Sequence, residues 1–219
     1  MSKQIKGDDL GSSLFSDRER MELWFSANWK KCIVWAFAII AAAVVVVILS
    51  SYVRSKDAEF RQKLGSAPVA ELADVIAQDP DHEAVPAARL RLANGLLAKG
   101  DVNGAKAEFE KLAGDVNAAV ALQENGKIGA ACCVELLGDA KGAMNSYQAL
   151  AMDAANSMPL RAEAGFHAAR LLMDAGDRAG AEKVLNSVLA GKDAAEQSYY
   201  LVLCDSMLKK IAVPQDGKK

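Results

Sequence analysis

Histidine, cysteine and aromatic residues are scarce in this chain, and each shortage excludes a class of protein. Its 219 residues include two histidines, four cysteines and 6% aromatics. The cysteines form no CxxC pair and no cluster with histidine, so neither a zinc site nor a disulfide-rich fold is expected. His82 stands in a proline-flanked loop and His167 in the middle of a predicted helix. Neither has a second candidate ligand nearby, so surface positions are the simpler interpretation for both.

The sequence also lacks the patterns that carry catalysis. We find no phosphate-binding loop, catalytic triad, paired catalytic carboxylates or metal-ligand cluster. We therefore predict that the chain is not an enzyme and uses no cofactor and no small-molecule substrate. An enzyme with an unrecognised site is the alternative.

The cysteines themselves are expected to be small buried thiols. A disulfide from Cys132 or Cys133 to Cys204 remains open as an alternative. A bridge within the Cys132–Cys133 pair is disfavoured, because adjacent side chains of a helix point in different directions.

Net charge and composition narrow the class further. The chain has 26 Lys and Arg against 28 Asp and Glu, a formal net charge of −2. It therefore lacks the basic surface that nucleic acid requires. Its second half is rich in alanine and poor in aromatics, which suits closely packed helices better than a sheet. The predicted fold class is all-α.

One stretch without a charged residue organises the chain. It runs from Ile33 to Val53, with Lys30 and Lys31 before it and Arg54 just after. As a helix it would be about 30 Å long, the thickness of the hydrocarbon core of a bilayer. A strand would leave its backbone groups unsatisfied in lipid. We predict a transmembrane helix over residues 33–53.

The apolar stretch is expected to be an uncleaved anchor. It is longer than the apolar region of a cleaved signal peptide and is followed by no A-x-A site. Residues before it form a predicted N-terminal segment, 1–32, whose first dozen residues are expected to be disordered. Ser16 and Glu19 resemble a capping box that would begin a short helix at the membrane surface. Basic residues flank both ends of the span equally, so charge does not set its orientation.

Beyond the span, a six-residue pattern occurs three times. It reads Gly-Asp-x-x-Gly-Ala at residues 100–105, 138–143 and 176–181, with equal spacing. Each copy lies between two helical patterns, so each predicts a helical hairpin over about 86–113, 124–151 and 162–189. The first glycine is expected to end one helix in a left-handed cap, and the aspartate to cap the next helix. Because one hairpin cannot bury its own face, the three should stack on one another.

Flanking segments complete this domain in the prediction. Residues 55–64 should continue the span as a charged helix, and Pro68–Gln78 and Ala194–Ile211 should be the terminal helices. The domain therefore covers 54–211. Residues 212–219 are predicted to be a disordered tail.

The hairpins resemble the tetratricopeptide repeat. That family has small residues on both sides of a Gly-Asp corner and an aromatic residue in the second helix. Ala93, Ala105 and Phe109 match around the first corner, and Tyr147 takes the aromatic position in the second repeat. The period is longer than in that family, and Leu185 replaces the aromatic residue in the third repeat. The resemblance implies an α-solenoid of helical hairpins with a protein-binding groove.

The whole architecture is similar to the ancillary SecYEG translocon subunit (YfgM-type) family. The likeness rests on Trp24-Phe25-Ser26-Ala27-Asn28 before a single span, followed by divergent repeats. It implies a single-pass protein of the bacterial inner membrane, with a cytoplasmic N-terminus and a periplasmic repeat domain. It also implies a role in protein translocation or folding, with the translocon and periplasmic chaperones as partners.

The tetratricopeptide resemblance also indicates where a protein partner would bind. Its groove-lining positions on the first helix of each hairpin correspond to Leu90, Asn94, Leu97, Ile128, Cys132, Glu135, Phe166, Arg170 and Met173. The leading hypothesis is a membrane-anchored protein-binding scaffold. A scaffold that associates with itself in an envelope complex is the alternative. The opposing interpretation of each groove residue is packing against the next repeat.

Overall fold

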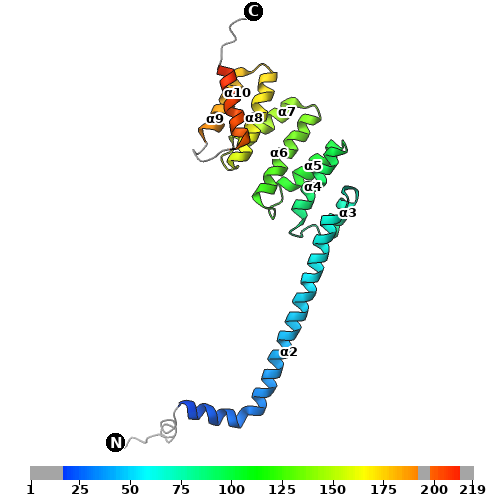
Figure 1. Cartoon of the computed structure of the whole chain (residues 1–219), viewed down its shortest axis with the longest axis vertical. Helices are drawn as coiled ribbons and strands as arrows, with labels where there is room; N and C mark the ends of the chain where they lie inside the picture. Colours follow the sequence, from blue (N-terminus) through cyan, green and yellow to red (C-terminus); the bar gives the residue numbers. More distant parts are fainter. Residues whose placement is uncertain (1–16, 192–197, 213–219) are drawn as a thin grey trace, which may run out of the picture. The chain divides into compact units, whose positions relative to one another are not determined.

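The structure is a computed structural model and describes residues 17–191 and 198–212. This part of the chain consists of helices joined by turns (Figure 1). Within these ranges there is no strand, as the sequence predicted. Contacts divide the chain into a first unit that ends at Phe60 and a second that begins at Arg61. Each unit is described by itself below.

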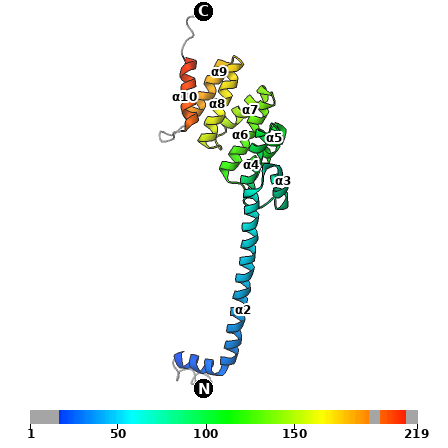
Figure 2. The same ribbon diagram turned by 45° about the vertical axis from the view of Figure 1, so that its right-hand side comes forward.

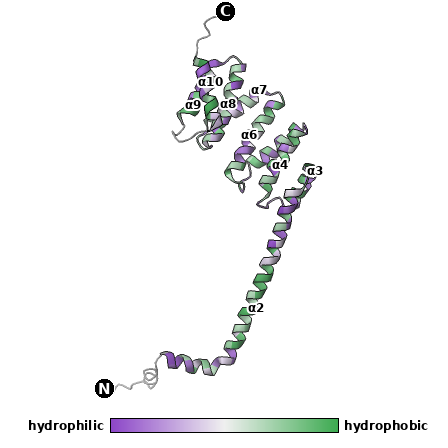
Figure 3. Ribbon diagram, viewed as in Figure 1, coloured by the Kyte–Doolittle hydropathy of each residue, from purple (hydrophilic) through white to green (hydrophobic). Residues whose placement is uncertain are grey.

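The first unit consists mainly of one helix, α2 (Asp17–Ser66). The last turns of α2, after Phe60, belong to the second unit. The middle of α2 is continuously apolar and its ends are polar (Figure 3). Its apolar side chains are exposed, and α2 is long and apolar enough to cross a membrane. The sequence predicted a separate short helix around Trp24. The structure assigns these residues and the span to one continuous helix, since no glycine or proline interrupts residues 17–64, but this helix bends sharply near its start (Figure 1).

The second unit is a series of helices that follow the last turns of α2. Each helix packs on the next along the chain, and α4 also contacts α6, α6 contacts α8, and α8 contacts α10 (Figures 1 and 2). The helices are α3 (Val69–Gln78), α4 (Val85–Ala98), α5 (Val102–Ala113), α6 (Val120–Leu136), α7 (Ala140–Met152), α8 (Met158–Asp174), α9 (Arg178–Ala190) and α10 (Tyr199–Ala212).

These bounds agree with the predicted helices except at some ends. α6 and α8 each begin four residues before the predicted starts at Glu124 and Ala162. For α8 the cause is local, since Ser157 caps the helix by accepting from the Leu160 N–H. Residues 213–219 of the predicted tail lie outside the residues that the structure describes. The same is true of residues 194–197 of the last predicted helix.

The three Gly-Asp corners have the predicted geometry. At the first corner, Gly100 has φ +82°, a conformation that glycine adopts without strain. Its N–H donates to the Leu97 carbonyl, and the Asp101 N–H donates to the Leu96 carbonyl. The Asp101 carboxylate then accepts from the Gly104 N–H and caps α5. This is a Schellman end joined directly to an N-cap.

The second and third corners repeat these bonds. Gly138 and Gly176 have φ +87° and +80°. The aspartates that follow them accept from the N–H of Gly142 and Gly180. The second glycine of each pattern is needed for a different reason: a Cβ at that position would collide with the capping carboxylate.

The core repeats with the corners. The alanines before and after each corner are buried, so adjacent helices approach closely. One larger side chain per hairpin fills the space beside them. The small residues are Ala93, Ala105, Ala131, Ala143, Ala169 and Ala181, and the larger ones are Phe109, Tyr147 and Leu185.

Candidate binding groove

Five of the residues predicted to contact a partner line one hollow of about 270 Å³. We call this hollow the groove. Three of the five lie on α4 and two on α6, at the i, i+4 and i+7 positions of one helix face. The two helices are separated by α5 in the chain but contact each other directly. The predicted residues in the groove are Leu90, Asn94, Leu97, Ile128 and Cys132.

The other four predicted residues do not line the groove. Glu135 accepts a bond of 2.6 Å from Arg170, which ties α6 to α8. Phe166 packs against the core and against the ring of Tyr200 at 5.9 Å. Met173 is 39% exposed near the end of α8. For Glu135 and Phe166 the structure therefore shows the packing role that the sequence left open.

The sequence missed the remaining groove residues. These come from α5, from α7 and from neighbouring turns of α6 and α8: Phe109, Asn125, Gly129, Tyr147, Glu163 and His167. A signal for two of them was present in α8. Glu163 and His167 are spaced from Phe166 and Arg170 as neighbours on one helix face.

His167 is not the surface residue that the sequence predicted. Its ring stacks on Tyr147, with centroids 5.1 Å apart, and meets Phe166 edge-on at 5.6 Å. Tyr200 lies 5.8 Å away. Burial, with a smaller effect from the charge of Arg170, lowers the pKa of His167. Its Nδ1 is buried and has no hydrogen-bond partner among the residues described.

Burial shifts the pKa of several polar groups around His167. Burial raises the pKa of Tyr147, with smaller effects in the same direction from Cys132 and Glu135. Burial likewise raises the pKa of the Cys132 thiol and of the Glu163 carboxyl. A thiol with a raised pKa is a poor nucleophile at neutral pH.

Cys133 and Cys204 are buried thiols, as predicted, whereas Cys32 is half-buried on α2. All four cysteines are free. Cys133 packs among the residues of α4–α6 and Cys204 among those of α7–α10. The Cys204 thiol donates to the Ala162 carbonyl at 3.4 Å. The alternative of a bridge to Cys204 is absent from this structure.

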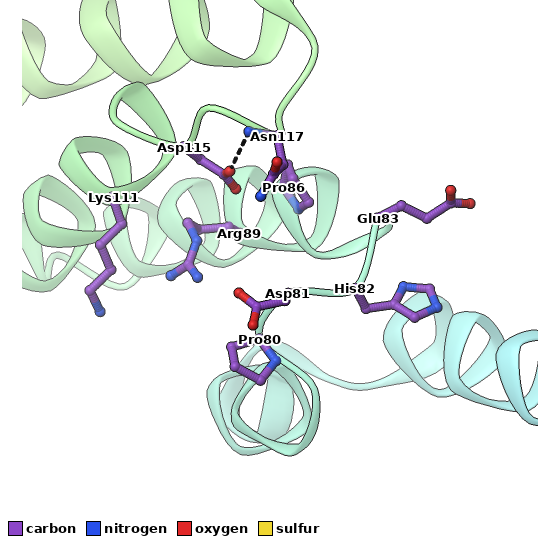
Figure 4. Close-up of a pocket in the computed structure, with 9 residues that line it drawn as sticks. All are labelled: Pro80, Asp81, His82, Glu83, Pro86, Arg89, Lys111, Asp115 and Asn117. Atoms are coloured by element: carbon purple, nitrogen blue, oxygen red, sulfur yellow. Dashed lines mark hydrogen bonds between the residues drawn. The ribbon is translucent and has the colours of Figure 1, made fainter.

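A second hollow, of about 350 Å³, lies where the α3–α4 and α5–α6 connections meet (Figure 4). Its walls mix both signs of charge, and internal bonds hold several of them. Arg89 donates to Glu108 at 2.7 Å, and Asp115 accepts from the Asn117 N–H at 2.9 Å. Glu83 points away from the other labelled side chains and pairs with Arg61. This second hollow therefore offers little free binding capacity.

Comparison with known proteins adds no relative, because no protein-family model, curated protein or solved structure matches the chain. In the part of the chain that the structure describes, no group of three or more His, Cys, Asp or Glu residues could hold a metal ion.

Proposed function

We propose that this chain is a membrane-anchored scaffold that binds protein segments in the groove. The observation that carries the proposal is the convergence of five predicted contact residues from α4 and α6 on one hollow. A groove between helices with an aliphatic wall is a common docking surface for an apolar or amphipathic segment.

The repeat architecture supports this function. We propose that the three hairpins form a divergent tetratricopeptide-like solenoid, with α3 and α10 as its terminal helices. The identical corners and buried alanines favour this assignment, and so does the packing of each helix on the next. In such a stack the first helices of successive hairpins lie side by side and provide one continuous binding face.

The apolar part of α2 would tether the groove to a membrane. Tethering raises the effective concentration of the groove near membrane partners. From the family resemblance we place the protein in the bacterial inner membrane, with its N-terminus in the cytoplasm and the groove in the periplasm. The partners would be the SecYEG-type translocon and periplasmic chaperones, and the work would need neither catalysis nor a cofactor.

Site-specific photocrosslinking tests this function. A photoreactive amino acid at Asn94, which is exposed within the groove, should crosslink to a translocon subunit or a periplasmic chaperone. The same amino acid at Val116, which is 88% exposed outside the groove, is the matched control. Ile128→Asp should abolish the Asn94 crosslink by placing a charge on the apolar wall.

Two results would overturn parts of the proposal. Crosslinks from Asn94 only to further copies of this chain would favour the self-associating scaffold. A topology reporter fused after Lys219 should read out in the periplasm, and a cytoplasmic signal would refute both the localisation and the proposed partners.

A further inference from the structure

The groove carries unbalanced negative charge at its α8 side. Glu163 is the charged residue of its lining. The neighbouring cation, Arg170, is shared between Glu135 at 2.6 Å and Asp174 at 4.0 Å. No counter-charge among the lining residues neutralises Glu163.

Two residues of α8, Glu163 and His167, line the groove. Glu163 is half-buried and receives a hydrogen bond from Tyr200. His167 lies one turn further along α8, and its buried Nδ1 has no partner in the part of the chain that the structure describes. The carboxylate of Glu163 is therefore the acceptor that a donor group of a ligand would meet on this side of the groove.

The rest of the lining is mixed, with Asn94, Asn125 and Tyr147 beside an aliphatic wall. Leu90, Leu97 and Ile128 supply aliphatic surface, and the ring of Phe109 adds to it. An anionic segment would meet Glu163 without a counter-charge, and a neutral one would leave that carboxylate partly desolvated and unpaired. A cationic side chain on an apolar segment satisfies both parts of the groove.

We propose that Glu163 and His167 form a subsite for one lysine or arginine side chain of an otherwise apolar protein segment. This inference rests on the proposed function, because it names the chemistry of the segment that the groove would bind. Glu163 would pair with the cation, the ring of His167 would lie beside it, and the aliphatic wall would hold the flanking residues.

A set of three peptides tests the subsite on the full chain in nanodiscs. The probe is a dye-labelled, acetylated and amidated peptide of leucine, alanine and serine with one central lysine. Its two analogues carry norleucine or glutamate at that position. Fluorescence anisotropy, corrected with empty nanodiscs, should show the lysine peptide binding about tenfold more tightly than the norleucine peptide, and the glutamate peptide most weakly.

Variants assign this preference to the subsite. Glu163→Gln should remove most of the lysine preference and leave the affinity of the norleucine peptide unchanged. His167→Phe keeps a ring beside the carboxylate and should leave most of the preference in place. Glu182→Gln removes the same charge at an exposed position on α9 and should leave the preference intact. Circular dichroism establishes that each variant is folded.

The outcomes separate the two proposals. Equal affinity of the lysine and norleucine peptides refutes the subsite, as does a lysine preference that survives Glu163→Gln. If the lysine and norleucine peptides bind equally well and Ile128→Asp abolishes the binding of both, the proposed groove is supported and the subsite is not. If none of the three peptides binds above empty nanodiscs, both proposals fail.

Discussion

Replacing Gly126 with alanine should destabilise the second unit, although alanine is the better helix former. Gly126 lies on α6 where this helix meets the backbone of α5. A Cβ there would be 2.5 Å from the Ala113 nitrogen and 2.7 Å from the Phe109 carbonyl oxygen. Both contacts are about 1 Å shorter than normal van der Waals separation. Because backbone atoms cannot rotate away, the two helices must move apart.

The net effect follows from two opposing terms. Glycine to alanine inside a helix gains about 1 kcal/mol. Overpacking costs about 1–3 kcal/mol, and a backbone-to-backbone clash belongs at the upper end of that range. We expect a net loss of about 2 kcal/mol, which lowers Tm by about 4–8 °C for a domain of this size.

Thermal unfolding of the full chain in detergent, followed by circular dichroism at 222 nm, measures the change. Gly65→Ala is the matched control, because Gly65 is also helical but has open space around its Cβ position. We expect its Tm to be unchanged or slightly raised. A Gly126→Ala protein that melts at or above the wild-type temperature would refute the close approach of α5 and α6.

Three further predictions concern a cap, a titration and two thiols. Asp139→Ala removes the bond to the Gly142 N–H and should cost about 1 kcal/mol of unfolding free energy, measured by urea denaturation. Lowering the pH from about 7.5 to about 5.5 should destabilise the fold, because burial lowers the pKa of His167 and the unfolded chain therefore binds the proton first. His167→Phe should remove this contribution to the pH dependence of the free energy of unfolding. Burial raises the pKa of Cys133 and of Cys204 to about 11. Iodoacetamide at neutral pH should therefore alkylate both only after unfolding, as read by peptide mass spectrometry.

Each of these predictions has a contrary result. Unchanged urea midpoints for Asp139→Ala would show that the carboxylate does not cap α7. An identical pH slope in wild type and His167→Phe would place the titration elsewhere. Rapid alkylation of Cys133 in the native protein would contradict the burial of its thiol.

The corners were predictable because their causes are local. A glycine that must adopt positive φ and an aspartate that caps the next helix lie within a few residues of each other. Their repetition shows that the same local solution is used three times. The apolar run of α2 was predictable for a similar reason, since length and the absence of charge are properties of one continuous segment.

The groove was predictable only in part. Helical spacing and the family resemblance identified Leu90, Ile128 and Cys132, because they lie on one face of their own helices. Tyr147 and His167 were assigned other roles, since their positions in the groove depend on how α7 and α8 pack against α6.

The sequence by itself determined an all-helical chain with one apolar segment and three repeated hairpin corners. These features depend on backbone conformation, capping and hydrophobicity, which act over a few residues or one continuous run. Only the tertiary structure decided that Glu135 would be tied to Arg170 and that His167 would be buried against Tyr147. Those contacts join residues on different helices, so they depend on the packing of helices distant in the chain.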